Sequence, residues 1–250
     1  MREAGRLVAQ ALRLCRDMAK PGAKTVDIDR AVEALYHGRG ALPLFKGYPG
    51  RVPFPASTCI SLNEQVVHGI PGQRVVREGD LVKIDTACKL NGWCADAAIT
   101  IMVGEVSPAK KRLVEVAEQV LRTAMVEMAR RRWWTEVALQ MQRVAESAGF
   151  SVVTQYVGHG IGRVMHESPQ VPNFLNRDVK KHDFKLEEGL VLAVEPMVNM
   201  GREDTDTLRD HWTVVTRDGL PSAHVEHTLA VTAQGVYVIT ADEDNCMVPR

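Results

Sequence analysis

Apolar positions recur at helical spacing in two pairs of segments, and strand-like runs follow each pair. The pairs cover residues 3–19 with 25–37 and residues 109–131 with 136–148. A segment rich in glycine, proline and aromatic residues, 38–55, predicts a long loop. Besides a hairpin at 81–103, short apolar or alternating runs predict strands at 58–62, 66–67, 150–156, 190–194, 212–216, 226–232 and 236–239. Because the order of helix, helix and strands occurs twice, we expect one α+β domain over residues 1–250, with internal pseudo-symmetry and a shared central site.

The hairpin carries two aspartates whose placement follows from its turn. Asn91-Gly92 favours a two-residue turn of type I′, because that turn needs positive φ at both central positions. In the resulting register Asp96 lies opposite Ala87, and Asp85 lies two residues from Ala87 on the same face. The two carboxylates are then diagonal neighbours, roughly 7–8 Å apart at Cα. Like charges that close in apolar strands repel each other and lose hydration unless a cation lies between them, which predicts a metal site.

Three further residues could complete that site. Glu195 follows the continuous apolar run 191–194, which indicates a strand buried on both faces. Glu226 lies in another apolar strand, and His159 lies between two glycines. Taken singly, each candidate has an ordinary explanation: a glutamate on a solvated strand face, a histidine in a turn, or aspartates separated by a different register. Taken together, four carboxylates and one imidazole suit divalent Mn, Fe, Co or Zn, held as a pair that carboxylates bridge.

Composition narrows the class of protein. Charge is balanced, with 31 basic and 31 acidic side chains, so nothing indicates general binding to nucleic acid or to a membrane surface. No apolar run has transmembrane length, and residues 1–6 lack the apolar stretch of a secretory signal. The five cysteines are odd in number and contain no CxxC pair, which favours reduced thiols in a cytoplasmic protein. No long apolar stripe remains unexplained, so we expect a monomer.

Three motifs occur in order in the second half of the chain: Gly158-His159-Gly160-Ile161-Gly162-Arg163 with His166-Glu167-Ser168-Pro169, then Glu195-Pro196-Met197-Val198, then Ser222-Ala223 with Glu226-His227-Thr228. With them, essentially the whole chain resembles the type I methionine aminopeptidases of metallopeptidase family M24. The resemblance implies the pita-bread fold, in which two pseudo-symmetric halves share a central antiparallel sheet with outer helices. It also implies two divalent ions, with Asp96 and Glu226 bridging both, Asp85 binding one, and His159 and Glu195 binding the other.

The same resemblance assigns roles beyond metal binding. Glu195 is the candidate general base and proton shuttle. His68 would contact the substrate or the tetrahedral intermediate, and His166 would hydrogen-bond the substrate backbone and help to stabilise the oxyanion. Both histidines could instead be buried turn residues. His227 points to the strand face opposite Glu226, so we assign it a structural role.

A pocket for methionine should be unbranched, apolar and soft-walled. The resemblance implies that Cys59, Phe54, Met165 and Trp212 line it, and the alternative for each is simple core or loop packing. The loop 47–54 is longer than the usual spacing in the family, so whether Phe54 reaches the pocket depends on how this loop folds.

The resemblance implies that the protein removes the N-terminal methionine of nascent polypeptides, prefers a small second residue and meets the ribosome transiently. One alternative is an X-Pro aminopeptidase, which usually carries a separate N-terminal domain for which 250 residues leave no room. Another is a catalytically inactive pita-bread module that binds peptides or proteins, in which metal ligands are typically lost. All five ligand positions are filled here, which favours the methionine aminopeptidase. Arg130-Arg131-Arg132 could touch ribosomal RNA, although a solvated run of charges is the simpler interpretation.

Overall fold

The computed structural model describes residues 1–241 and 246–250. Both predicted helix pairs are present: α1 (Arg2–Met18) with α2 (Thr25–Gly38), and α3 (Pro108–Met128) with α4 (Trp134–Ser147). A short α5 (Arg177–Lys181) follows in the second half. Within the described residues, no helix combines the length and the apolar character that crossing a membrane requires.

Strands occupy most of the remaining chain in both halves. The first half contains β1 (Leu42–Pro43), β2 (Cys59–Leu62), β3 (Leu81–Leu90) and β4 (Trp93–Met102). The second half contains β5 (Ser151–Val152), β6 (Gly158–Gly160), β7 (Glu167–Val171), β8 (Val191–Val194), β9 (Met197–Asn199), β10 (Thr205–Thr207), β11 (Val214–Thr216), β12 (Ser222–His224), β13 (His227–Thr232), β14 (Gly235–Val238) and β15 (Met247–Pro249).

Two strand predictions differ from the structure. The predicted strand at 66–67 is wrong, because Val66 and Val67 lie in a loop that exchanges single backbone hydrogen bonds with Val214. The strand predicted over 150–156 is reduced to Ser151–Val152. The valines of both segments, Val66, Val67, Val152 and Val153, are buried with little regular sheet pairing, so an apolar run overestimates the strand length.

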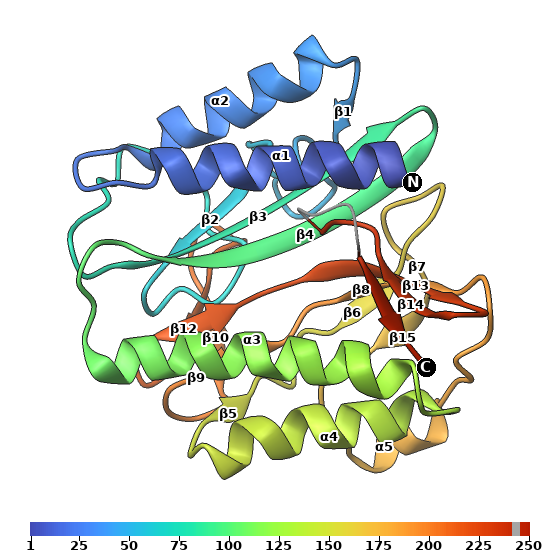
Figure 1. Cartoon of the computed structure of the whole chain (residues 1–250). Coiled ribbons are helices and arrows are strands. Elements are labelled where there is room, and N and C mark those ends of the chain that lie inside the picture. The colour runs from blue at the N-terminus through green and yellow to red at the C-terminus, as the bar shows by residue number, and fades with distance from the viewer. Residues whose placement is uncertain (242–245) are drawn as a thin grey trace.

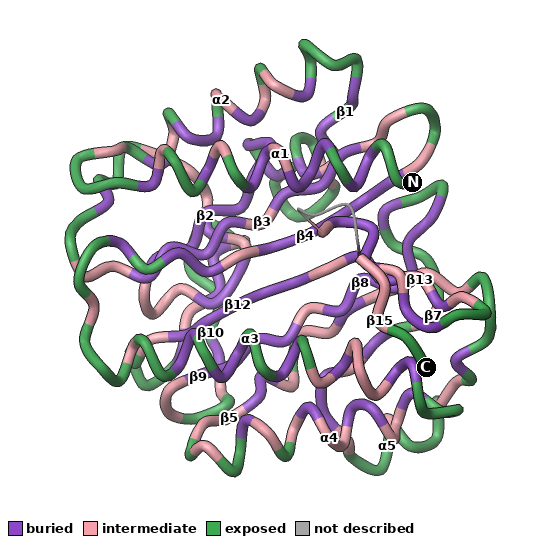
Figure 2. The backbone as a smooth tube through the Cα atoms, in the orientation of Figure 1, coloured by how far each residue is buried: buried purple, intermediate pink, exposed green. Residues whose placement is uncertain are grey.

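The helix pairs lie on the outside of the molecule, with the strands between them (Figure 1). Residues of the strands and of the inner helix faces are mostly buried, whereas residues on the outward helix faces are exposed (Figure 2). The apolar core is divided accordingly. One cluster lies under α1 and α2 and includes Val8, Ile28, Tyr36 and Ile84. A larger one lies under α3 and α4 and includes Trp134, which is buried and donates from Nε1 to Pro172 O at 2.9 Å.

The two halves are joined along one edge of β4. In the first half, β4 covers one edge of β3, while β1 and β2 share the other. The free edge of β4 meets the segment 224–228 of the second half. There Ala98 and Glu226 form an antiparallel bridge, in which Glu226 N donates to Ala98 O at 2.9 Å. On one side of this bridge, the Thr228 hydroxyl bonds both Asp96 N and Asp96 O, at 3.0 and 2.7 Å. This seam places acidic residues from both halves beside each other.

Candidate metal centre and substrate pocket

The hairpin that carries the two aspartates has the predicted register. Asn91 and Gly92 both have positive φ, 50° and 77°, as a type I′ turn requires. Every pair from Leu81↔Met102 to Leu90↔Trp93 follows from that turn, and Asp96 lies opposite Ala87. Asp85 and Asp96 therefore point to the same face, and both border the same cavity.

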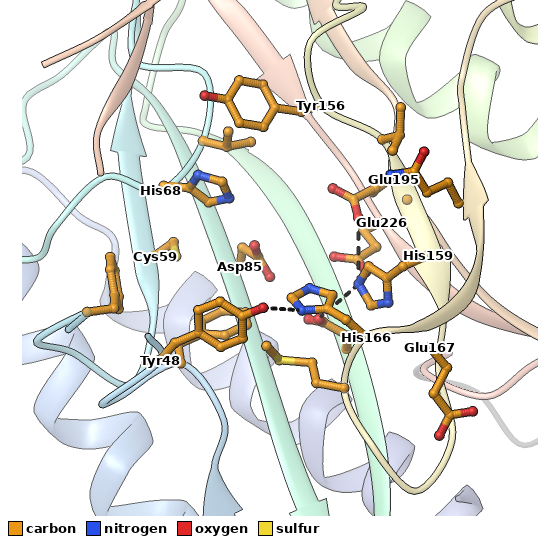
Figure 3. A pocket seen from close by; sticks show the side chains of 18 of the residues that line it. Tyr48, Cys59, His68, Asp85, Tyr156, His159, His166, Glu167, Glu195 and Glu226 are labelled. Carbon is orange, nitrogen blue, oxygen red and sulfur yellow. Dashed lines mark hydrogen bonds and ion pairs between the residues drawn. The ribbon is translucent and has the colours of Figure 1, made fainter. Parts of the chain in front are cut away.

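Elements of the second half bring the other three candidates to that face. His159 is the middle residue of β6, which pairs with β8. Glu195 follows the last residue of β8, and Glu226 lies on the seam just before β13. Figure 3 shows His159, Glu195 and Glu226 on one side of the cavity and Cys59, His68 and Tyr48 on the other. The structure thus brings together all five residues that the sequence suggested as metal ligands.

The ligand atoms are close enough to share a cation. One ligand atom each from Asp96, His159 and Glu226 lie within 4.8 Å of one another. His159 Nε2 lies 3.9 Å from Asp96 Oδ2 and 3.8 Å from Glu195 Oε1. These separations exceed a hydrogen bond, so the groups face one another without being bonded directly.

The electrostatics of the cluster favour a positive charge between its members. Burial, followed by mutual repulsion, raises the pKa of Asp85, Glu195 and Glu226 well above the usual range of carboxyl groups. Burial also raises the pKa of Asp96 to about 7. In contrast, burial lowers the pKa of His159 to about 4, so its imidazole is neutral and able to ligate at pH 7.

Within the part of the chain that the structure describes, three buried oxygens of the cluster have no hydrogen-bond partner: Asp85 Oδ1, Asp96 Oδ1 and Glu226 Oε1. An unpaired buried oxygen of a charged group is costly. A divalent cation satisfies such oxygens and removes the repulsion between the carboxylates. Because the donor set is four carboxylates and one imidazole, it fits the divalent metals expected from the sequence.

Next to the cluster lies a cavity of about 480 Å³ with an apolar wall. The four residues expected to form a methionine pocket, Cys59, Phe54, Met165 and Trp212, all line it. Phe45 and Tyr48 join them, and both belong to the segment predicted as a loop. The carboxylate cluster and this apolar wall thus line the same cavity.

The long loop 47–54 folds onto this wall. Gly47 N donates to Phe54 O at 2.8 Å, and Phe54 N donates to Tyr48 O at 3.0 Å, so the loop closes on itself. Trp212 Nε1 donates to Val52 O at 2.7 Å, and the Phe54 ring meets the Trp212 ring edge-on, with centroids 5.3 Å apart. Phe54 is only 2% exposed. The loop therefore supports the indole of Trp212.

Two histidines outside the carboxylate cluster also face the cavity. The His166 ring lies 4.2 Å from the His159 ring, between centroids. His68 contacts the rings of Tyr156 and Trp212 edge-on. Burial lowers the pKa of His166 and brings the pKa of His68 to about 4, so both rings are neutral at pH 7.

His227 lies on the other side of the strand from Glu226, as expected. Its Nδ1 lies 3.0 Å from the Thr240 hydroxyl, and it borders a different cavity from the one that Glu226 borders. This geometry accords with a structural role.

Sequence reasoning missed three residues at or behind the site: Tyr48, Tyr156 and His224. Tyr48 bonds His166, Tyr156 packs on His68, and His224 Nε2 lies 3.8 Å from Glu195 Oε2. Nothing local in the sequence indicates that Tyr48 reaches a residue 118 positions away.

Comparisons with known proteins agree with this geometry. The model of metallopeptidase family M24 matches residues 1–233. Methionine aminopeptidase 1 of Bacillus subtilis is 43% identical over 240 residues, which cover 96% of this chain and 94% of that protein. The crystal structure of methionine aminopeptidase from Thermotoga maritima superposes with a TM-score of 0.90 at 39% identity, covering 96% of this chain and 94% of that one.

A more distant structure shares the fold alone. Prolidase from Pyrococcus furiosus superposes with a TM-score of 0.76 at 20% identity, covering 97% of this chain but 63% of the prolidase chain. The pita-bread fold predicted from the sequence is confirmed by these superpositions. Given the match of the family model and the relatives at 35–43% identity over nearly the whole chain, the protein belongs to metallopeptidase family M24 and, within it, to the methionine aminopeptidases.

Proposed function

We propose that this protein hydrolyses the peptide bond after an N-terminal methionine, with two divalent ions held by Asp85, Asp96, His159, Glu195 and Glu226. The observation that carries the proposal is the cluster of four carboxylates and one neutral imidazole in a cavity with an apolar wall. Asp96 and Glu226 lie on the seam between the halves, which suits them to bridge two ions. When bound, such ions lower the pKa of water and polarise a peptide carbonyl.

The protein's own residues supply the proton transfers and the hydrogen bonds. Glu195 accepts a proton from the attacking water and delivers it to the leaving amine, a role for which its carboxylate at the cavity wall is placed. His166 donates a hydrogen bond to the carbonyl oxygen on which negative charge develops. His68, which lines the same cavity, contacts the substrate or the tetrahedral intermediate.

The apolar wall selects the first residue of the substrate. Sulfur and aromatic groups of Cys59, Met165, Phe54 and Trp212 suit an unbranched thioether side chain. The carboxylate cluster in the same cavity suits a free α-amine, so an internal peptide bond has no place there. The enzyme is therefore an exopeptidase in this proposal.

The second residue of the substrate, the contact with the ribosome and the location in the cell are parts of the same proposal. The substrates are nascent chains with a small second residue, which brings the enzyme to the ribosome transiently and places it in the cytoplasm. Within the described residues, no disulfide joins any of its five cysteines, in keeping with a reducing compartment. Which of Mn, Fe, Co or Zn is used depends on availability as much as on affinity.

The decisive experiment is release of methionine from Met-Ala-Ser. The protein is stripped with EDTA, and Mn, Co, Fe or Zn is added back, with Ala-Pro-Ala as the control peptide. Metal-dependent release of methionine alone is the expected result. Cleavage of Ala-Pro-Ala instead would indicate an X-Pro aminopeptidase, and cleavage of neither peptide by the metal-loaded protein would indicate a binding module.

A further inference from the structure

A buried histidine lies beside Glu195 and has no part in the chemistry described above. His224 is the last residue of β12, and only 1% of its surface is exposed. Its Nε2 lies 3.8 Å from Glu195 Oε2 and has no hydrogen-bond partner among residues 1–241 and 246–250. The other oxygen, Glu195 Oε1, lies 3.8 Å from His159 Nε2. The Glu195 carboxylate is therefore placed between two imidazoles, one facing each oxygen.

The position of His224 is set by its backbone on both sides. The backbone N of His224 donates to the Thr100 hydroxyl at 3.0 Å, and that hydroxyl donates to His224 O at 2.6 Å. On the other edge of β12, His224 pairs with Met197, two residues after Glu195. Because these contacts come from β4 and β9, the imidazole is held against Glu195 by both halves of the molecule.

The side chain of His224 does not line the substrate cavity, whereas Glu195 does. His224 is thus a supporting residue and not a group that meets substrate. A buried nitrogen without a partner costs free energy, and the facing carboxylate oxygen is the acceptor within reach.

We propose that His224 positions Glu195, by donating a hydrogen bond from Nε2 to Oε2 when the carboxylate is ionised and a cation is bound. This inference rests on the proposed metal centre. The bond fixes the rotation of the carboxylate, so that Oε1 is presented to the ion beside His159. Closing the 3.8 Å separation to hydrogen-bond length needs only a small rotation of the Glu195 side chain. Groups that orient metal ligands in this way typically change metal affinity or activity by about 10- to 100-fold.

The test compares His224→Leu, which removes the donor, with His224→Gln, whose amide can still donate. His227→Leu is the matched control, because His227 is a half-buried imidazole three residues along the chain that bonds Thr240 instead. Affinity for Co²⁺ is measured by calorimetry, and the visible absorption of the Co²⁺ protein reports the geometry of its ligands. KM and kcat for Met-Ala-Ser are measured in parallel.

We expect His224→Leu to weaken Co²⁺ binding about 10- to 100-fold, to alter the Co²⁺ spectrum, and to lower kcat more than it raises KM. The glutamine variant should restore most of the affinity and the spectrum, and His227→Leu should resemble the wild type. Unchanged Co²⁺ binding in His224→Leu, or equal losses in the leucine and glutamine variants, would overturn the inference.

If His224→Leu does not fold, His224→Asn replaces it, because the shorter amide cannot reach Oε2. Weaker Co²⁺ binding in the asparagine variant than in the glutamine variant supports the inference, and equal binding overturns it. A wild-type protein that binds no Co²⁺ and releases no methionine would refute the proposed function as well. A wild-type protein that does both, with variants that match it, would refute only the role of His224.

Discussion

The Tyr48 hydroxyl lies 2.7 Å from His166 Nδ1, so a residue of the long loop holds the ring of a histidine in the other half of the chain. A neutral imidazole has one donor nitrogen and one acceptor nitrogen. When the Tyr48 hydroxyl donates to Nδ1, the hydrogen of His166 is on Nε2. That tautomer is the one that can donate to a substrate oxygen.

Removing the His166 side chain or the Tyr48 hydroxyl should lower turnover without loss of bound metal. His166→Ala should cut kcat by about 10²- to 10³-fold, as expected for the loss of one oxyanion donor. Tyr48→Phe should cause a smaller loss, because the ring remains but its tautomer and orientation are no longer set. Steady-state kinetics and metal analysis check both variants. Loss of bound metal from His166→Ala would instead identify His166 as a ligand.

Asp96→Asn should abolish activity, because Asp96 is proposed to bridge both ions. The variant should also lose the rise in melting temperature that metal gives the wild type, since ligands that bind only the folded state stabilise it. Thermal unfolding with and without Mn²⁺ measures this effect. Asp206→Asn is a suitable control, because that carboxylate is exposed and pairs with Arg217 at 2.9 Å. An active Asp96→Asn would refute the assignment of the site.

Metal affinity should increase with pH between 6 and 7. The pKa of Asp96 is about 7 in the metal-free protein, so its carboxyl is mostly protonated at pH 6 and must lose that proton to bind a cation. His159, with a pKa of about 4, is already neutral over this range. Below pH 7 the apparent affinity should rise by about tenfold per pH unit for each proton released.

The same shift predicts the stability of the metal-free protein. The folded pKa of Asp96 is raised, so its contribution to stability is fully present below about pH 4 and is lost as the pH rises through about 7.

Calorimetric titration with Mn²⁺ at pH 6 and pH 8, in buffers of different ionisation enthalpy, counts the protons released when the metal binds. Equal proton release at the two pH values would contradict the assignment to Asp96.

Trp212→Phe should weaken discrimination for methionine. Phenylalanine lacks the Nε1 donor that bonds Val52 O and leaves part of the indole volume empty, so the pocket wall becomes looser. We expect a several-fold rise in KM for Met-Ala-Ser and a smaller ratio of kcat/KM between Met-Ala-Ser and Leu-Ala-Ser. Trp133→Phe is the control, because Trp133 is 38% exposed and lies outside the cavity. Equal effects of the two substitutions would argue against a role for the loop in specificity.

Gly158→Ala should destabilise the fold and displace His159. A Cβ at this position would collide with Ala193 O on the paired strand β8, so β6 and β8 would have to separate. We expect a loss of about 1–3 kcal/mol in the free energy of unfolding together with weaker metal binding. Gly38→Ala, at the end of α2, has no atom within 4 Å of the added Cβ and should be neutral or slightly stabilising. Chemical denaturation of both variants makes the comparison.

The sequence by itself determined the local elements and the spacing of chemistry within them. The Asn91-Gly92 turn allows one register in β3 and β4, and that register alone places Asp85 and Asp96 on one face. Apolar periodicity located the four long helices, because each helix buries one stripe of its own residues. The residues near His159, Glu195 and Glu226 carried enough of the family's motifs to predict the fold and the activity.

Only the tertiary structure decided which distant residues meet. The bridge between Ala98 and Glu226, the bond from Tyr48 to His166, and the approach of His224 to Glu195 join segments that no local pattern relates. Val66 and Val67 failed as a strand for the same reason, since their burial comes from Val214. Hydrophobic periodicity reports which face of an element is buried, whereas the identity of the partner depends on how all the elements pack, and packing is a property of the whole chain.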